Sequence, residues 1–247
     1  MKLRAVAVVL LLGVAPVWAA EVSWPMEPME PDLEDKPSLQ RGAMLFANYC
    51  MGCHSLKFQR YERTADDLEI PHELFTENLI FTGAKIGELM QIAMPPESAK
   101  NWFGAPPPDL TMVAKVRNPE WLYNYLKTFY LDPERPFGVN NKVFPNVGMP
   151  NALHELQGVQ KEGCIQVPKI APNTEEECGQ LVLEEGTGRY TPEEFDQAVE
   201  DIVNFLYYVA EPVRTERERL GIYVILFLII LYVFTRLLGR EYEKEMH

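Results

Sequence analysis

The stretch Tyr49-Cys50-Met51-Gly52-Cys53-His54-Ser55 decides how this chain of 247 residues is interpreted. It contains the C-x-x-C-H pattern, in which two cysteines stand three positions apart and histidine follows at once. On one helical turn this spacing sets both sulfurs against the two vinyl groups of a porphyrin and puts the histidine under its iron. We therefore expect one covalent haem c, with Cys50 and Cys53 as thioether anchors and His54 as the proximal iron ligand.

Two other kinds of site share part of this pattern. A zinc site needs four ligands, but the two remaining cysteines, Cys164 and Cys178, are far apart and form no second C-x-x-C pair. A thioredoxin-like redox pair needs a preceding strand and a β-α-β setting, and neither is visible around the motif. The haem interpretation is therefore favoured over both.

The chain is strongly acidic, and its first residues have the pattern of an export signal. The chain has 36 acidic and 23 basic residues, which disfavours nucleic acid and favours attraction of a basic partner. Residues 1–19 have the charged start, apolar run and small-residue end of a secretory signal peptide, with an uncleaved anchor as the alternative. Export would place the haem domain in an oxidising compartment, where spare cysteines tend to pair.

Cys164 and Cys178 are the spare pair. They flank a segment rich in proline and glutamate that has no helical or strand period, so we predict a loop. We also predict a disulfide between them, with two free thiols as the alternative. Closing a loop of about 15 residues would stabilise the fold by roughly 3 kcal/mol in the chain-entropy model.

The haem domain is predicted at residues 38–212, after a proline-rich, extended lead-in at residues 20–37. Its first helix is expected to begin with Ser38 as the N-cap and to run into the haem motif. Gly42 lies on one face of this helix. Because glycine has no side chain, another helix can cross closely there.

That second helix should be the last one of the haem domain. It starts with the capping box Thr191-Pro192-Glu193-Glu194 and stops at Glu211-Pro212. Another helix starts at Asn118-Pro119-Glu120. A helix leading into C-x-x-C-H and a late helix packed across it are typical of small mono-haem cytochromes c. The predicted fold is therefore mainly α, a cytochrome c-like helical domain with loop insertions and one C-terminal transmembrane helix.

The end of the chain has the pattern of a membrane anchor. A charged connector at residues 213–219 precedes an apolar segment at residues 220–239, close to the length of about 20 residues needed to span a bilayer. The alternative, a buried helix of a soluble domain, is less favoured because the segment is apolar on all sides. Residues 240–247 would then form a cytoplasmic tail, with the haem domain in the periplasm and membrane lipid around the anchor.

The sixth iron ligand decides between electron transfer and chemistry at an open iron. Met149 is preferred, because it lies in a non-periodic loop between Gly148 and Pro150. Met94 is the rival methionine, while His72 and His154 are expected at the surface. A methionine ligand would raise the reduction potential and leave no open position for oxygen or peroxide.

These residues resemble one family, cytochrome c1 of the quinol-cytochrome c reductase (bc1) complex. The resemblance runs over residues 38–240. It rests on four stretches and the tail anchor: Cys50-Met51-Gly52-Cys53-His54-Ser55, Ala105-Pro106-Pro107-Pro108-Asp109-Leu110 with Arg117, the loop from Phe144-Pro145 to Met149-Pro150, and Asp201-Ile202-Val203-Asn204-Phe205-Leu206 through Ala210-Glu211-Pro212.

The resemblance assigns roles residue by residue. Met149 falls on the axial methionine and Arg117 on an arginine that meets a haem propionate. Trp121 falls where relatives have a tyrosine near the propionates, and its indole nitrogen could still donate. Pro108 would offer its carbonyl to the ring N–H of His54. The cysteine pair after Met149 lies in an insertion that matches no general family feature.

The resemblance also implies partners and a direction of electron flow. In that family the haem takes an electron from the Rieske iron-sulfur protein, which quinol reduces at cytochrome b, and passes it to a soluble or tethered cytochrome c. The expected setting is a dimeric complex in the bacterial inner membrane. The alternatives are a stand-alone membrane-tethered cytochrome c feeding an oxidase, and a haem enzyme or gas sensor with an open iron.

Overall fold

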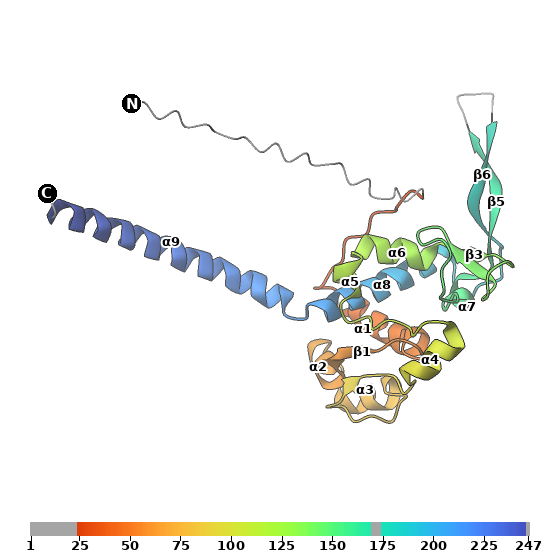
Figure 1. Ribbon diagram of the computed structural model, residues 1–247, viewed down its shortest axis with the longest axis horizontal. Helices are drawn as coiled ribbons and strands as arrows, with labels where there is room; N and C mark the ends of the chain where they lie inside the picture. The colour runs from red at the N-terminus through yellow and green to blue at the C-terminus, as the bar shows by residue number, and fades with distance from the viewer. Residues whose placement is uncertain (1–23, 169–173, 246–247) are drawn as a thin grey trace, which may run out of the picture.

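A computed structural model describes residues 24–168 and 174–245; the predicted signal peptide lies outside the described residues. Figure 1 shows a helical body from which a β-hairpin and one long helix project in different directions. In chain order the described elements are α1 (Lys36–Leu45), η1 (Phe46–Cys50), β1 (Leu56–Arg60), α2 (Tyr61–Asp67), α3 (His72–Leu79), β2 (Leu89–Met90), α4 (Pro96–Phe103), α5 (Val113–Val116), α6 (Pro119–Lys127), β3 (Phe129–Leu131), β4 (Val139–Asn141), α7 (His154–Gln157), β5 (Gln160–Pro168), β6 (Thr174–Leu183), α8 (Pro192–Ala210) and α9 (Arg214–Glu245).

The body is mainly α, and its described strands form three separate antiparallel pairs: β1 with β2, β3 with β4, and β5 with β6. Helix α1 packs against α8, and α8 also contacts α5 and α6. The helical architecture with a C-terminal anchor is as predicted.

The start of α1 differs from the prediction. The N-cap is Asp35, whose side chain accepts a hydrogen bond from the backbone N–H of Ser38 at 3.0 Å, and Pro37 lies in the first turn. Proline suits that turn because its fixed φ is helical and the N–H that it lacks has no partner there. Ser38 is therefore inside the helix, and its hydroxyl donates to Asp201 Oδ1 of α8 at 2.7 Å.

The predicted close crossing at Gly42 is confirmed. A Cβ atom added to Gly42 would lie 2.0 Å from the backbone oxygen of Asp201 and 2.7 Å from Cβ of Phe205. The backbones of α1 and α8 are thus in direct contact, because residue 42 has no side chain. This contact sets the position of the α1 segment that leads into the haem motif.

An ion pair between a buried carboxylate and a partly exposed arginine lies beside this crossing. Asp201 has a side chain only 2% exposed, and Arg41 donates to its two oxygens at 2.6 and 2.8 Å. Asn204 donates to the hydroxyl of Ser38 at 2.8 Å and accepts from the backbone N–H of Asp32 at 3.1 Å. A buried carboxylate is tolerated only when paired and hydrogen-bonded, so this network ties α1, α8 and the lead-in to one register.

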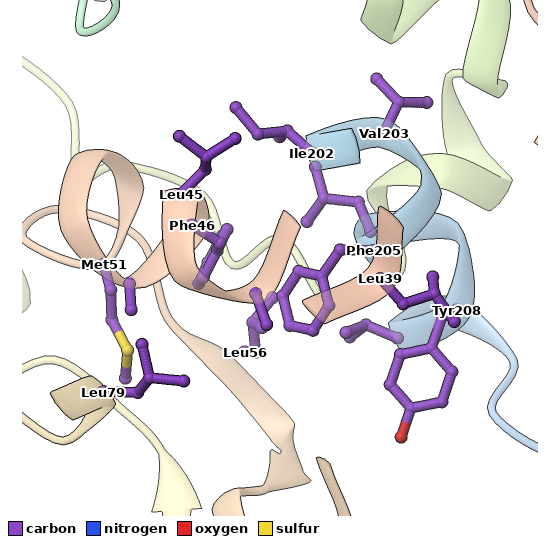
Figure 2. Close-up of a cluster of buried hydrophobic side chains, with 14 of the residues drawn as sticks. Leu39, Leu45, Phe46, Met51, Leu56, Leu79, Ile202, Val203, Phe205 and Tyr208 are labelled. Carbon is purple, nitrogen blue, oxygen red and sulfur yellow. The ribbon is translucent and has the colours of Figure 1, made fainter. Parts of the chain in front are cut away.

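The apolar core fills the angle between the same two helices (Figure 2). Leu39 and Phe46 face α8, and the rings of Phe46 and Phe205 lie 5.7 Å apart. The apolar stripe of α8 is buried throughout: Phe195, Val199, Ile202, Val203, Leu206 and Val209. Each such side chain contributes about 1.5–3 kcal/mol by leaving water, so packing stabilises this crossing far more than helix propensity does.

Residues 160–168 and 174–183 form a hairpin rather than the predicted loop. Strands β5 and β6 pair over their length, with Cys164 opposite Cys178 and a disulfide between them. The hairpin projects from the body (Figure 1), so neither face has a core to cover. Apolar and polar residues need not alternate on such strands, and the usual sequence signal for a strand is therefore missing.

The long helix α9 supports the predicted membrane anchor. It includes both the charged connector from Arg214 onward and the apolar segment, so these form one continuous helix. Its most apolar window has a mean hydropathy of 2.4 and is not buried by any other part of the described chain. A buried helix of a soluble domain would have protein around it, so the exposed apolar surface favours lipid.

We predict that Gly42→Ala will destabilise the fold. Alanine normally favours a helix over glycine by about 1 kcal/mol, but here the added carbon would collide with the backbone of Asp201. Because backbone cannot move aside cheaply, we expect a loss of at least about 3 kcal/mol in the free energy of unfolding. Chemical denaturation of the full chain in detergent measures it. Gly87→Ala is the control, since a Cβ there meets only Glu62 Oε2 at 3.8 Å. Equal stability of the two variants would contradict the close crossing.

Candidate haem site

The C-x-x-C-H motif lies on one tight turn at the end of the first helical segment. The π-helical turn η1 ends at Cys50, and Met51 N–H donates back to the carbonyl of Phe46 at 2.9 Å. The carbonyl of Cys50 accepts from the N–H of Cys53 at 3.1 Å and from that of His54 at 2.9 Å. Single π turns inside helices are frequent at functional sites. This one holds the two sulfurs and the imidazole together.

Neither motif cysteine forms a disulfide. Burial raises the pKa of the Cys50 thiol to about 12, so it stays protonated at neutral pH. No three His, Cys, Asp or Glu side chains gather to hold a metal ion anywhere in residues 24–168 and 174–245. The motif also follows a helix rather than a strand, so the zinc and thioredoxin-like alternatives have no support here.

The ring of His54 is held by a single backbone carbonyl. Its Nδ1 lies 2.7 Å from the carbonyl oxygen of Pro108, which can only accept, so Nδ1 carries the proton and Nε2 keeps its lone pair. The residue is 8% exposed, and this burial lowers the pKa of the imidazole. A neutral ring with a free Nε2 is the form that binds iron.

The segment around Pro108 is tied to the motif. The N–H of Leu110 donates to the carbonyl of Ser55 at 2.9 Å, and Asp109 accepts from the N–H of Lys57 at 2.7 Å. Helix α5 follows directly, and α6 begins shortly after it. The proline-rich stretch therefore connects the haem motif to the elements that carry Arg117 and Trp121.

Arg117 and Trp121 form part of one aromatic cluster. The guanidinium carbon of Arg117 lies 4.9 Å from the centre of the Trp121 ring and 5.8 Å from that of Phe144. Trp121 in turn stacks on Tyr125, with ring centres 4.8 Å apart and planes 10° from parallel. Asn118, at φ 70°, caps α6 and accepts from the N–H of Trp121 at 2.7 Å, so the start of the helix orients the stack.

Met149 reaches this cluster from the loop after β4. Arg135 donates to the carbonyl of Asn146 at 2.9 Å, and Asn140 accepts from the N–H of Asn146 at 2.8 Å. These two bonds fix the backbone of the loop just before Met149. The hydroxyl of Tyr125 donates to Met149 Sδ at 3.4 Å. Sequence reasoning missed Tyr125 as a polar group, because its spacing on α6 matched only the apolar side. The available signal was that Trp121, Tyr125 and Phe129 are each four residues apart, which is the spacing of neighbouring side chains on a helix.

The rival ligands lie elsewhere or in a less constrained setting. Met94 is half-buried between β2 and α4. Its segment is tied to the haem motif, because the N–H of Ile92 donates to Ser55 Oγ at 3.0 Å. His72 is exposed and hydrogen-bonded to Asp66 at 2.7 Å, and His154 is exposed on α7. Cys164 and Cys178 lie on the projecting hairpin, so their disulfide is not part of this site.

The side chains present fit haem c. Two cysteines outside any disulfide and a neutral imidazole lie on one turn. The Met149 thioether meets Tyr125 of the aromatic cluster, and the Arg117 guanidinium lies over Trp121 of the same cluster. Together with the apolar helix α9, they define a mono-haem, membrane-anchored cytochrome of the c type. Comparison with known proteins gives a narrower answer. A model of the cytochrome c1 family matches residues 32–246, and the chain belongs to this family.

Several curated relatives agree over most of the chain. Cytochrome c1 of Allochromatium vinosum is 46% identical over the full length of both chains. The ammonia monooxygenase gamma subunit of Nitrosomonas europaea is 42% identical over 87% of this chain and 86% of its own length. Cytochrome c1 of Rhodobacter capsulatus is 25% identical over 85% of each chain. The chain is accordingly a haem c electron-transfer subunit of the bc1 complex, with one covalent haem.

We predict that the two motif cysteines each form one thioether bond. Cys50→Ala or Cys53→Ala should leave haem attached through one sulfur, whereas the double variant should lose covalent haem altogether. Mass spectrometry after acid-acetone extraction measures the attachment. The variant Cys164→Ala with Cys178→Ala is the control and should keep its haem, because those residues lie on the hairpin. Covalent haem in the Cys50/Cys53 double variant would contradict the assignment.

Proposed function

We propose that this chain takes an electron from the Rieske iron-sulfur protein and passes it to a soluble or tethered cytochrome c. In this proposal His54 and Met149 are the axial ligands of the haem iron. The observation that supports this proposal is that both side chains are held in place. The Tyr125 hydroxyl donates to Met149 Sδ, and the carbonyl of Pro108 accepts from Nδ1 of His54. A haem closed by histidine and methionine supplies reversible one-electron transfer at high potential.

The surroundings of the site favour a carrier over an enzyme. Peroxide or oxygen chemistry needs acid-base groups beside an open iron position. The two histidines that could serve, His72 and His154, are both at the surface, and His72 is engaged with Asp66. Met149 instead accepts a hydrogen bond from Tyr125, whose ring packs against Phe129 and Phe144.

The ligation is tested with carbon monoxide on the reduced, detergent-extracted holoprotein. We expect the wild-type spectrum to ignore the gas and that of Met149→Leu to show binding, since leucine cannot ligate iron. Met94→Leu is the matched control and should behave as wild type. Gas binding by wild type would mean an open iron, and catalysis or sensing would then replace the carrier proposal. Gas binding by Met94→Leu alone would move the ligand to Met94.

Arg117 is proposed to pair with a haem propionate. Its guanidinium is exposed at the end of the stack that includes Trp121, so it can turn toward a carboxylate without losing its aromatic contact. A partly buried propionate needs a charge-assisted partner, and arginine can offer two parallel N–H donors. Trp121 is proposed to lie on the same side and to donate through its indole nitrogen.

The proposed partners are cytochrome b and the Rieske protein, within a dimeric complex in the bacterial inner membrane. The haem domain would lie in the periplasm and the C-terminus in the cytoplasm, with α9 in lipid. Arg240 and Lys244 after the anchor fit this orientation by the positive-inside rule, but the support is weak because Arg214, Arg217 and Arg219 precede the anchor. Purification without cytochrome b would favour a stand-alone tethered cytochrome instead.

Acidic charge should steer the electron acceptor. The chain carries a formal net charge of −13, so a basic cytochrome c is attracted over a distance that added salt shortens. We expect the second-order rate of its reduction to fall steadily as ionic strength rises, by an order of magnitude or more. Stopped-flow spectroscopy measures the rate, with an uncharged small-molecule acceptor as the control. A flat salt response with the basic acceptor would remove the steering argument.

A further inference from the structure

The hydroxyl of Tyr125 donates a hydrogen bond to the sulfur of Met149, with Oη and Sδ 3.4 Å apart. We propose that Tyr125 is a positioning residue that orients this thioether and, through the O–H···S bond, raises the reduction potential of the haem. This inference rests on the proposed function, in which Met149 is an iron ligand. It adds a residue to which neither the motif nor the family resemblance assigns a role.

The ring of Tyr125 is fixed on three sides. Trp121 stacks on its face, while Phe129 and Phe144 meet it edge-on, with ring centres 5.2 and 6.5 Å away and planes inclined by 69° and 71°. Its backbone is held as well, because Asn141 Nδ2 donates to the Tyr125 carbonyl at 2.7 Å. A ring with so little freedom gives its hydroxyl a defined direction, and that direction is toward Met149.

A thioether sulfur has two lone pairs, so it can bind iron with one and accept a hydrogen bond with the other. Accepting a hydrogen bond draws electron density from the sulfur and makes it a weaker donor to iron. The ferric state depends more on that donation than the ferrous state does, so the bond favours the reduced form and raises the potential. Hydrogen bonds to metal ligands tune metal sites generally in this way.

The hydrogen bond also restricts the sulfur itself. Methionine has three rotatable side-chain bonds, and the loop holds the backbone of Met149 rather than its side chain. With the Tyr125 hydroxyl in place, one lone pair is committed and the other is directed away from it. Tyr125 therefore reduces the freedom that the thioether must lose on ligation, which strengthens the closure of the iron.

The test compares Tyr125→Phe with Tyr123→Phe in the full-length holoprotein in detergent. Phenylalanine keeps the ring and its aromatic contacts and removes only the hydroxyl. Tyr123 is the matched control, because it is buried on the same helix but its hydroxyl accepts from Lys127 Nζ at 3.2 Å instead of donating to Met149. Potentiometric titration should show a more negative midpoint potential for Tyr125→Phe and the wild-type value for Tyr123→Phe. Carbon monoxide, which should leave the wild-type spectrum unchanged, should bind Tyr125→Phe to a measurable extent, but more slowly than it binds Met149→Leu.

A second variant protects the test against a folding defect. Replacing Tyr125 by 4-aminophenylalanine puts a weaker N–H donor in the same place, and its midpoint potential should fall between those of wild type and Tyr125→Phe. Equal potentials in all three proteins would overturn the inference and leave Tyr125 a packing residue. If Met149→Leu still opens the iron in that case, the proposed function stands. If wild type itself binds the gas freely, the proposed function fails first.

Discussion

The contact between the backbones of α1 and α8 at Gly42 is the constraint on which the rest of the structure depends. Helix α1 continues into η1 and then into the haem motif, so the depth at which it crosses α8 sets where the two thiols and the imidazole lie. The neighbouring pair of Arg41 and Asp201 makes sliding of one helix along the other costly, because a shifted carboxylate would be buried without its partners. Apolar packing drives the association of these helices, and the glycine and the ion pair define its register.

The site is assembled from segments that are distant in sequence and are held by single hydrogen bonds. Pro108 holds the ring of His54, Ser55 holds the backbone of Ile92, and Tyr125 holds the sulfur of Met149. The first directs a ring plane, the second fixes a backbone segment and the third directs a lone pair, while each adds only about 1 kcal/mol to stability. Such bonds matter because electron transfer needs a site that changes little between oxidation states. A ligand oriented before the electron arrives needs little rearrangement when it does.

The sequence predicted the start of a helix correctly where it contained a clear N-capping pattern. The Thr191 capping box and the Asn118 cap are both present, since side-chain donors and acceptors within four residues decide them. Ser38 was assigned the wrong role because Asp35 three residues earlier competes as a cap, and the Ser38 hydroxyl instead meets Asp201 and Asn204, which are distant in sequence. The hairpin was missed because its strands project from the body and carry no alternating pattern. The contact of Pro108 was predicted through the family resemblance, whereas Tyr125 was not predicted as a donor at all.

The sequence by itself determined the haem motif, the acidic charge, the apolar anchor and the class of fold. These are properties of residue types at short spacing, and they hold whatever the rest of the chain does. Only the tertiary structure decided that the Tyr125 hydroxyl meets Met149, that Arg117 lies over Phe144, and that Ser38 meets Asp201. Such contacts depend on the directions of side chains after distant segments have packed. Packing is a property of the whole chain, so no local pattern contains it.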